Sequence, residues 1–391
     1  MRNWKLIILV FCLMITSGCW DSIELEERGF VIGVGIDLNE ESSDDDEGAL
    51  SLSQQFVIPT GSSQGGSGGE GGSGDAFQNI VSSGNTIFET VRRVAARTNR
   101  SPFYEHIKLI VISEEIAKST HFPDVLDYFL RYPEMRRGTQ VMVTPEKAGD
   151  ILGISPKNEK LPAMYIKSIS KNNYKNARMV PPTRIGKIHE NLLGYESYMI
   201  QMIVKLNSEE VKIAGQAVFN GYTDKLVGFI EEDATEGVNF ITGQLKGGLL
   251  EAKVKDEIVV YEMDKVKTNI EPIYEKGKIK FKVDIQTTGT IPESYKSFDL
   301  LDEEEIHQTE KAVKEKIYEF TDLAISRVRD ELKTDIFEFS KKFKTKYPNE
   351  WEQMKNDWDI GENYFRQSEI EVNVNAVVDR SGTIIRSTLE E

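Results

Sequence analysis

The sequence predicts an α+β or mixed α/β fold, arranged as three domains behind a short leader segment. Three observations predict it. Strand-like and helical segments alternate between residues 30 and 155, and residues 191–266 are mostly strand-like. After residue 267, a half-buried strand is followed by a long amphipathic helical stretch. A chain of 391 residues accommodates two or three domains of ordinary size.

The first 18 residues have the features of a cleavable signal peptide. Arg2 and Lys5 form a positively charged start, and residues 6–15, LIILVFCLMI, form an uncharged apolar run. A helix of this length measures roughly 15 Å, about half of a bilayer core, so it is too short to span a membrane stably. It has the size of the apolar segment of a secretion signal.

Cys19 is predicted to carry lipid. The preceding residues 16–18, TSG, are small and resemble a bacterial lipobox, in which the cysteine thiol takes a diacylglyceryl group before the signal is cleaved. Thr16 departs from the Leu, Val or Ile that is usual at its position. The alternative interpretation is an ordinary secretion signal followed by an incidental cysteine.

The composition excludes several classes of protein. The formal net charge is −16 at pH 7, whereas nucleic-acid binding needs clustered Lys and Arg. Loss of Arg2 and Lys5 with the signal removes two positive charges and takes −16 to −18. A body this acidic is not expected to be drawn to anionic lipid, so the lipid on Cys19 would hold the protein at the membrane. Cys12 leaves with the signal, so an internal disulfide is excluded.

Residues 19–190 are expected to form an N-terminal α/β domain. Its strands are predicted at residues 30–37, 50–58, 108–113 and 141–144, and its helices at residues 86–98, 114–118 and 122–132, with another opening at residue 145. The tract at residues 61–74, GSSQGGSGGEGGSG, cannot bury apolar surface, so we expect a disordered loop within this domain. Residues 155–190 are basic and contain Pro162, Pro181 and Pro182, so we expect them to be partly irregular.

Two further domains are expected after residue 190. The middle domain, residues 191–266, is small and mostly β, with strands at 211–219, 225–230 and 257–263 and an Asn-Gly turn at 220–221. The C-terminal domain, residues 267–391, is α+β, with long helices packed on an antiparallel sheet. Its long helical stretch, residues 303–346, carries one apolar stripe, which we expect to be core: Ile306, Val313, Ile317, Phe320, Ala324, Val328 and Leu332. Strands are expected at 279–285 and 369–379, with a turn at 380–382 leading into a last strand.

A search for catalytic motifs gives no active site. Residues 61–65 fit G-x-S-x-G around Ser63, but a Gly/Ser tract produces that pattern by composition alone. The four histidines, His106, His121, His189 and His307, show no metal-ligand spacing. The acidic run at residues 44–47 lacks the alternating ligands of a calcium loop and is expected to be a solvated loop. No enzyme activity, metal or cofactor is therefore expected.

Trp351 and Trp358 are predicted to lie on one helix face as buried anchors. The alternative interpretation is an exposed partner patch.

Several segments, taken in order, carry a family resemblance. They are CWD at 19–21, EL at 24–25, VIGVGID at 31–37, GNTIFE at 84–89, YEHIK at 104–108, EEIAK at 114–118, FLR at 129–131, GQAVF at 215–219, LVG at 226–228, DIF at 335–337 running on to Phe343, and YP at 347–348 followed by Trp351. Together with the lipobox they resemble the Ger(x)C family of spore germination lipoproteins over nearly all of the mature chain. The Gly/Ser tract resembles a variable insertion.

The resemblance implies the C subunit of a nutrient germinant receptor in a spore-forming bacterium. It implies a lipid tether at the outer face of the inner spore membrane, a polytopic membrane subunit and a second subunit as partners, no direct binding of the nutrient, and three α/β-type domains without enzyme activity. His106 is then a structural histidine. The alternative function is a lipid-anchored extracellular solute-binding protein or hydrolase, which would need a ligand cleft or a nucleophile and base within reach of each other.

Overall fold

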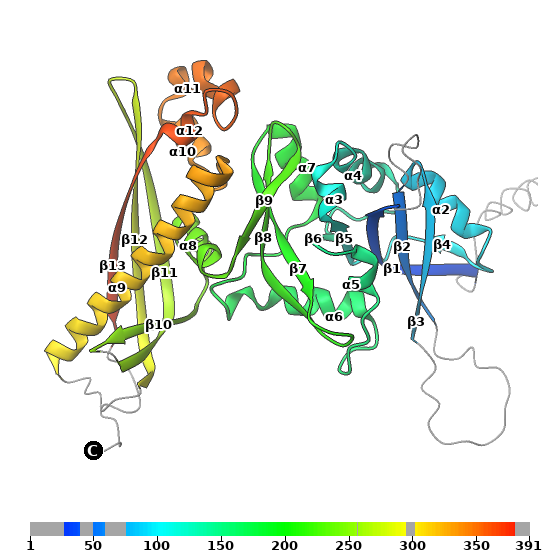
Figure 1. Cartoon of the computed structure of the whole chain (residues 1–391), viewed down its shortest axis with the longest axis horizontal. Helices are drawn as coiled ribbons and strands as arrows, with labels where there is room; N and C mark the ends of the chain where they lie inside the picture. The colour runs from blue at the N-terminus through cyan, green and yellow to red at the C-terminus, as the bar shows by residue number, and fades with distance from the viewer. Residues whose placement is uncertain (1–26, 40–49, 59–75, 256, 295–301, 380–391) are drawn as a thin grey trace, which may run out of the picture.

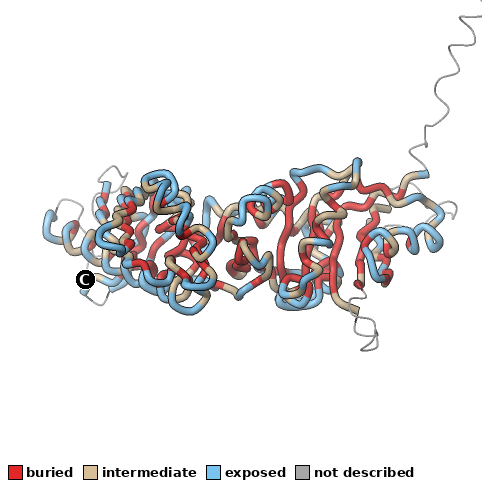
Figure 2. Tube along the Cα trace, turned by 90° about the horizontal axis from the view of Figure 1, so that it is seen from above, coloured by how far each residue is buried: buried red, intermediate tan, exposed pale blue. Residues whose placement is uncertain are grey.

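The computed structural model describes residues 27–39, 50–58, 76–255, 257–294 and 302–379. These residues form an elongated molecule with two β-sheets, one in each half (Figure 1). Buried residues run through the interior of both halves (Figure 2). The expected mixed α/β fold class is therefore confirmed in its coarse form. Over these residues, the helices lack the length and apolar character that crossing a bilayer requires.

The first sheet has the strand order β3-β2-β1-β5-β6-β7-β8-β9, with β4 paired beside the start of β1. β1, β5 and β6 are parallel neighbours, and the remaining pairs of the main path are antiparallel apart from the single parallel contact of β6 with β7. The strands are β1 (Arg28–Leu38), β2 (Leu50–Val57), β3 (Phe77–Gly84), β4 (Ser101–Phe103), β5 (Leu109–Ser113), β6 (Gln140–Thr144), β7 (Tyr198–Lys205), β8 (Val211–Asn220) and β9 (Lys225–Glu231).

Helices cover both faces of the first sheet. They are α2 (Ile87–Ala95), α3 (Glu114–Lys118), α4 (Phe122–Arg131) and α7 (Ile185–Gly194) on one face, and α5 (Ala148–Leu152) and α6 (Pro162–Ile169) on the other. Within β5, Ile110 and Ile112 pack against the first group, whereas Leu109 and Val111 pack against the second. A parallel strand buried on both faces is continuously apolar, which is why the sequence reveals β5 clearly.

Residues 155–190 are more regular than the sequence predicts. They contain α6, a 3₁₀ turn at Ser170–Tyr174 and the start of α7. Pro162 stands in the first turn of α6, where a missing N–H costs no intrahelical hydrogen bond. Two further prolines, Pro181 and Pro182, precede α7 and do not interrupt it. Pro162, Pro181 and Pro182 therefore stand at or before the start of a helix, where they do not interrupt it.

The second sheet has the order β10-β11-β12-β13. Its strands are β10 (Gly248–Val254), β11 (Glu257–Glu275), β12 (Lys278–Ser294) and β13 (Glu369–Val378). β12 and β13 are parallel, so the sheet is mixed and the expectation of an antiparallel sheet is wrong for this pair. The reason is that several helices connect these two strands and return the chain to the end where β12 begins, which a hairpin cannot do.

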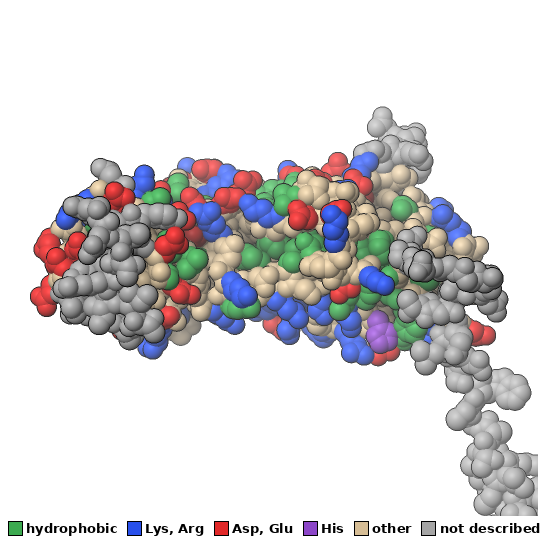
Figure 3. Space-filling view, turned by 90° about the horizontal axis from the view of Figure 1, so that it is seen from below, with side chains coloured by type: hydrophobic (Ala, Val, Ile, Leu, Met, Phe, Trp, Pro, Cys, Tyr) green, Lys and Arg blue, Asp and Glu red, His purple; other side chains and the backbone are tan. Residues whose placement is uncertain are grey.

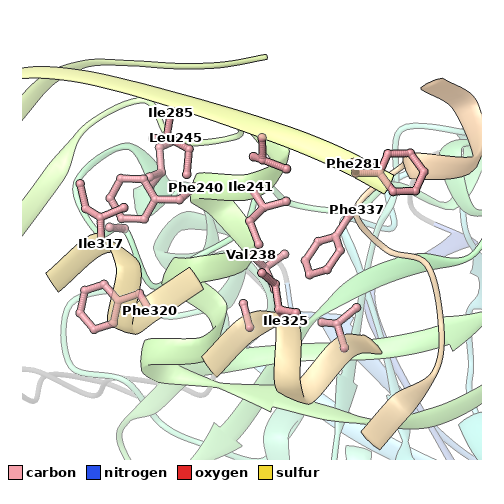
Figure 4. Packing of buried hydrophobic residues seen from close by; sticks show 14 of the residues in the cluster. Val238, Phe240, Ile241, Leu245, Phe281, Ile285, Ile317, Phe320, Ile325 and Phe337 are labelled. Carbon is pink, nitrogen blue, oxygen red and sulfur yellow. The ribbon is translucent and has the colours of Figure 1, made fainter. Parts of the chain in front are cut away.

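A 23-residue helix, α9 (Glu303–Ile325), crosses the second sheet and contacts β10 and β13. Its predicted stripe is confirmed as core, because Val313, Ile317 and Phe320 are buried in one cluster with sheet residues such as Phe281 and Ile285 (Figure 4). The helical stretch is not continuous to residue 346. A π-helical turn, Ser326–Leu332, ends at Lys333 with a left-handed φ of 54°, and the chain resumes as α10 (Phe339–Lys346), α11 (Pro348–Met354), a 3₁₀ turn at Lys355–Asp357 and α12 (Tyr364–Gln367).

The expected middle domain, residues 191–266, has no sheet of its own. β7, β8 and β9 extend the first sheet beyond β6, whereas β10 and β11 belong to the second. The two sheets meet at α8 (Glu232–Thr242), and this boundary coincides with neither of the expected ones. Alternation along the chain reveals strands but not which neighbours they pair with. The expected last strand after residue 380, the Gly/Ser tract and residues 1–18 lie outside the described residues.

Shortening the Gly/Ser tract is expected to leave the fold intact. Val57 of β2 pairs directly with Phe77 of β3, and the Ile58 N–H donates to the Ala76 carbonyl at 2.9 Å, so the segment between them starts and ends at neighbouring positions. Replacing residues 61–74 by a few glycines should raise the free energy of unfolding by about 1 kcal/mol, since closure entropy changes by about 0.6 kcal/mol per doubling of loop length. Urea unfolding and germination rate measure this, and a large loss in either would mean that the tract has a structural or functional role.

Candidate functional site

The two halves of the molecule are joined tightly through α8. At Gly237 a Cβ atom would lie 1.9 Å from the carbonyl oxygen of Phe320, so the backbones of α8 and α9 are in direct contact. On one side, the Asn239 side chain donates to the Ala177 carbonyl at 2.7 Å. On the other, the Thr268 hydroxyl of β11 donates to the Phe240 carbonyl at 2.6 Å. Figure 4 shows Val238, Phe240 and Ile241 of α8 within the hydrophobic core that the second sheet shares with α9.

A cavity of about 830 Å³ opens beside this helix crossing. Its walls come from residues 175–178, α8, β10 and α9, and they carry charges of both signs, including Lys175, Lys316 and Glu315. Glu236 of α8 is 2% exposed, and its Oε1 atom has no hydrogen-bond partner among the described residues. Its Oε2 atom lies 3.5 Å from Nε of Arg178. The cavity therefore contains one buried carboxylate that can accept a further hydrogen bond.

Burial raises the pKa of Glu236 to about 7, and the neighbouring Arg178 opposes the rise only in part. Arg178 is itself shared, because it also pairs with Asp233 at 2.7 Å. A carboxyl with a pKa in this range exists in both protonation states near neutral pH. It could take a proton or accept a hydrogen bond from a bound group. Among the described residues lining the cavity there is no Ser, Thr, Cys or His to act as a nucleophile beside it.

A second polar cluster joins the first sheet to the helices after α9. Asp335 is buried, accepts the Trp358 indole N–H at 2.8 Å, and accepts the Ser340 backbone N–H at 2.7 Å at the start of α10. The neighbouring Asp359 accepts the Ser197 hydroxyl at 2.5 Å, and its carbonyl accepts the Asn220 side-chain N–H at 3.2 Å. Ser197 immediately precedes β7, and Asn220 is the last residue of β8. These bonds therefore tie residues 335–359 to the first sheet.

Burial and the nearby charge of Asp335 raise the pKa of Asp359 to about 6. Burial also raises the pKa of Asp335, although its N–H donors favour the ionised form. Asp335 is held by structural hydrogen bonds, whereas Oδ1 of Asp359 has no hydrogen-bond partner among the described residues. The arrangement links residues 335–359 to the first sheet.

The candidate residues named from the sequence do not assemble into one site. His106 packs edge-on against Phe30 and Phe103, with ring centroids 5.4 and 5.9 Å away, in keeping with a structural histidine. His189 contacts Arg137 at 3.0 Å. Within the described ranges, no group of three or more His, Cys, Asp and Glu side chains could hold a metal ion. Cys19, Ser63 and the acidic run at 44–47 lie outside the described residues.

The two tryptophans meet, but the prediction that they share one helix face is wrong, because α11 ends at Met354 and Trp358 follows the 3₁₀ turn. Their rings lie 5.2 Å apart. Trp358 is a buried anchor at 2% exposure, whereas Trp351 is partly buried against the hydrophobic core of the second sheet. Glu236, Asp335 and Asp359 were not singled out by the sequence analysis. No motif marks them, because each is a single carboxylate whose partners lie far away in the sequence.

The pH dependence of stability tests the burial of Glu236. Its pKa is raised from 4.5 to about 7 in the folded state, so the fold binds a proton that the unfolded chain has already released between these pH values. The free energy of unfolding should therefore fall as pH rises from 4.5 to 7, by about 2 to 3 kcal/mol for this residue. Glu236→Gln should remove this slope, whereas the exposed Glu231→Gln should keep it. Urea unfolding at several pH values measures both, and equal slopes in the two variants would contradict the assignment.

Family models and known proteins match most of this chain in sequence. The family model described as "Spore germination protein N-terminal domain" matches residues 21–205, and the model described as "Spore germination B3/ GerAC like, C-terminal" matches residues 214–382. The chain is similar to three proteins of Bacillus subtilis (strain 168). Spore germination protein YndF is 29% identical, with 98% of each chain covered. Spore germination proteins B3 and A3 are 26% and 27% identical, each with 97% of this chain and 98% of the relative covered.

A solved structure has the same fold. The chain described as "Crystal Structure of the GerBC protein" superposes with a TM-score of 0.60 at 22% identity, over 90% of this chain and 99% of that one. A likeness at this level of identity establishes the fold alone, and it assigns no role to the site residues.

Proposed function

This chain belongs to the spore germination family that the two matching models describe, and from that membership we propose that it is the C subunit of a nutrient germinant receptor. In this role it is required for the germination response to nutrients. It contributes to receptor assembly and signalling without catalysing a reaction. The observation that carries the proposal is the extent of the match, which runs through both sheets and leaves only residues 206–213 between the models.

We propose that the subunit is a lipoprotein held at the outer face of the inner spore membrane by lipid on Cys19. The support is the order of the positive start, the apolar run of ten residues and the small residues before Cys19. Its partners in this role are a polytopic membrane subunit and a second receptor subunit, and it does not bind the nutrient itself.

One observation favours a different function. The 830 Å³ cavity with the buried Glu236 has the size of a small-molecule site, as a lipid-anchored solute-binding protein or hydrolase would need. A thermal-shift screen with amino acids and sugars separates the two functions. A ligand at about 100 times its dissociation constant adds roughly 2.7 kcal/mol to the free energy of unfolding, so a true solute-binding protein would show a clear shift.

Copurification tests the receptor role directly. The affinity-tagged chain is expressed at its natural level in sporulating cells, and spore membranes are solubilised in mild detergent. We expect the polytopic subunit and the second subunit to elute with it in fixed ratio, and an unrelated tagged spore lipoprotein serves as the control. Elution of the chain alone, in the presence of both other subunits in the same extract, would contradict the proposal.

A further inference from the structure

A cluster of four basic side chains lies where the parallel strands of the first sheet begin. Lys108 immediately precedes β5, and its carbonyl accepts the N–H of Gln140, the first residue of β6, at 3.2 Å. Gln140 in turn forms an isolated bridge with Arg184. Backbone pairing therefore places Lys108 and Arg184 on either side of one residue at the start of β6.

Lys167 and Lys171 join them from α6 and the 3₁₀ turn that follows it. The hydroxyl of Ser170 donates to the Gln140 side chain at 3.1 Å, which fixes the end of α6 against the same strand end. We call Lys108, Lys167, Lys171 and Arg184 the basic edge. Lys171 and Arg184 are exposed, and the other two are partly buried.

The basic edge has no counter-charge of its own. No ion pair joins any of its four members to an acidic side chain among the described residues, whereas neighbouring cations such as Lys157 and Arg178 are paired with Glu209 and Asp233. Partial burial and then the positive charges of Lys108, Lys171 and Arg184 lower the pKa of Lys167. Like charges held together by the backbone repel one another, and a bound anion would relieve that repulsion.

The charge balance around this edge is the reverse of that of the whole chain. Residues 155–190 contain eight Lys and Arg and two Asp and Glu, in a chain with a net charge of −16. Figure 3 views the molecule from the side on which α6 lies in Figure 1. Lys and Arg side chains are spread along the middle part of that view, and Asp and Glu gather at the end formed by the second sheet. The acidic net charge therefore does not describe this face.

The position of the lipid tether indicates what the basic edge faces. β1, β5 and β6 are parallel, so their first residues lie at the same edge of the sheet. The Lys108 N–H donates to the Ile32 carbonyl of β1 at 2.8 Å, four residues after β1 begins at Arg28, which is a distance of about 13 Å. The nine residues from Cys19 to Arg28 span at most about 30 Å. A bilayer that holds the lipid is thus within reach of the basic edge.

We propose that the basic edge docks on the anionic phospholipid headgroups of the membrane and so fixes the orientation of the subunit on the bilayer. Charges farther from the headgroups than a Debye length of about 8 Å are screened at physiological ionic strength, so the distant acidic surface opposes this contact only weakly. The choice of a membrane over an acidic protein rests on the proposed lipid at Cys19.

Vesicle flotation tests the proposal without using the lipid. The mature chain carrying Cys19→Ser is mixed with vesicles of phosphatidylcholine alone, or of about three parts phosphatidylcholine to two parts phosphatidylglycerol, in about 0.15 M salt. We expect binding to the anionic vesicles at least about tenfold stronger than to the neutral ones. Replacing Lys108, Lys167, Lys171 and Arg184 together by Gln should lower binding to anionic vesicles by about 100- to 1,000-fold, given the usual contribution of a basic residue near such a surface.

A matched control separates location from total charge. Lys265, Lys267, Lys276 and Lys278 are exposed on the second sheet, and replacing them by Gln changes the net charge equally. This variant should bind anionic vesicles within about threefold of the unsubstituted chain. If the fourfold basic-edge variant does not fold, the double variant Lys171→Glu and Arg184→Glu, which alters only exposed side chains, takes its place.

Three results would overturn the proposal: equal binding of the unsubstituted chain to both vesicles, as expected if the basic edge serves an acidic protein; equal losses in the basic-edge and control variants; or full binding by the double variant. Because the chain in this assay carries no lipid, its outcome is independent of whether Cys19 is lipidated in cells. A failure of the basic edge can therefore be told apart from a failure of the lipoprotein assignment.

Discussion

Cys19→Ala is expected to abolish lipid attachment and to release most of the protein from the spore membrane fraction. A single acyl chain binds a bilayer only marginally, whereas two or more chains hold a protein stably, at about 0.8 kcal/mol per buried CH₂. The basic edge could supply only weak and reversible binding in their absence. The local concentration of the subunit beside its partners should therefore fall, and germination with nutrient should slow strongly. Labelling with a clickable palmitate analogue, membrane fractionation and loss of spore refractility measure the three effects.

Cys12→Ala is the matched control for this prediction. Cys12 lies in the apolar run that the proposed cleavage before Cys19 would remove, so its replacement should leave labelling, fractionation and germination unchanged. If the Cys19→Ala protein took up label and fractionated with the membrane at the level of the unsubstituted protein, Cys19 would not be the site of lipid attachment. Loss of label with normal membrane fractionation would show that contacts with the partner subunits or the basic edge retain the chain without lipid.

Elements whose signal is local were predictable from the sequence. β5 reads as an unbroken apolar run because it is buried on both faces, and α9 shows its buried stripe because one face packs on a sheet. α8 was missed, and its composition explains why. Gly237, Thr235 and Asn239 are weak helix formers, and they stand in α8 because tertiary contacts favour them there. Thr235 and Asn239 use their side chains for hydrogen bonds, and Gly237 allows the close approach to α9.

The candidate sites depend on pairings that no local pattern contains. The basic composition of residues 155–190 is visible in the sequence, but Lys108 joins it only because β5 and β6 are parallel neighbours. In the same way, Asp359 meets Ser197 across 162 positions of the chain. Net charge does not reveal the basic edge for a related reason, since it sums over a surface on which acidic and basic side chains are unevenly spread (Figure 3).

Gly237→Ala is expected to be among the most destabilising single-methyl changes in the described part of the chain. The added Cβ would lie 1.9 Å from the Phe320 carbonyl oxygen, 2.5 Å from its carbonyl carbon and 2.8 Å from the Ala324 Cβ. Two of these are backbone atoms of α9, so no side-chain rotation relieves the overlap and the helices must separate. Overpacking in a well-packed core typically costs 1–3 kcal/mol, and displacement of a whole helix places this case at about 3 kcal/mol or more.

Gly138→Ala provides the control, because a Cβ at that position meets no atom within 4 Å. It should change the free energy of unfolding by less than about 0.5 kcal/mol. Urea denaturation of both variants measures the difference, and a Gly237→Ala protein with a midpoint close to that of Gly138→Ala would show that α8 and α9 do not touch. Since α8 connects β9 of the first sheet to β10 of the second, a folded Gly237→Ala protein should also hold its two halves less firmly. Limited proteolysis between residues 243 and 247 should then be faster than in the control, even under conditions where both variants remain folded.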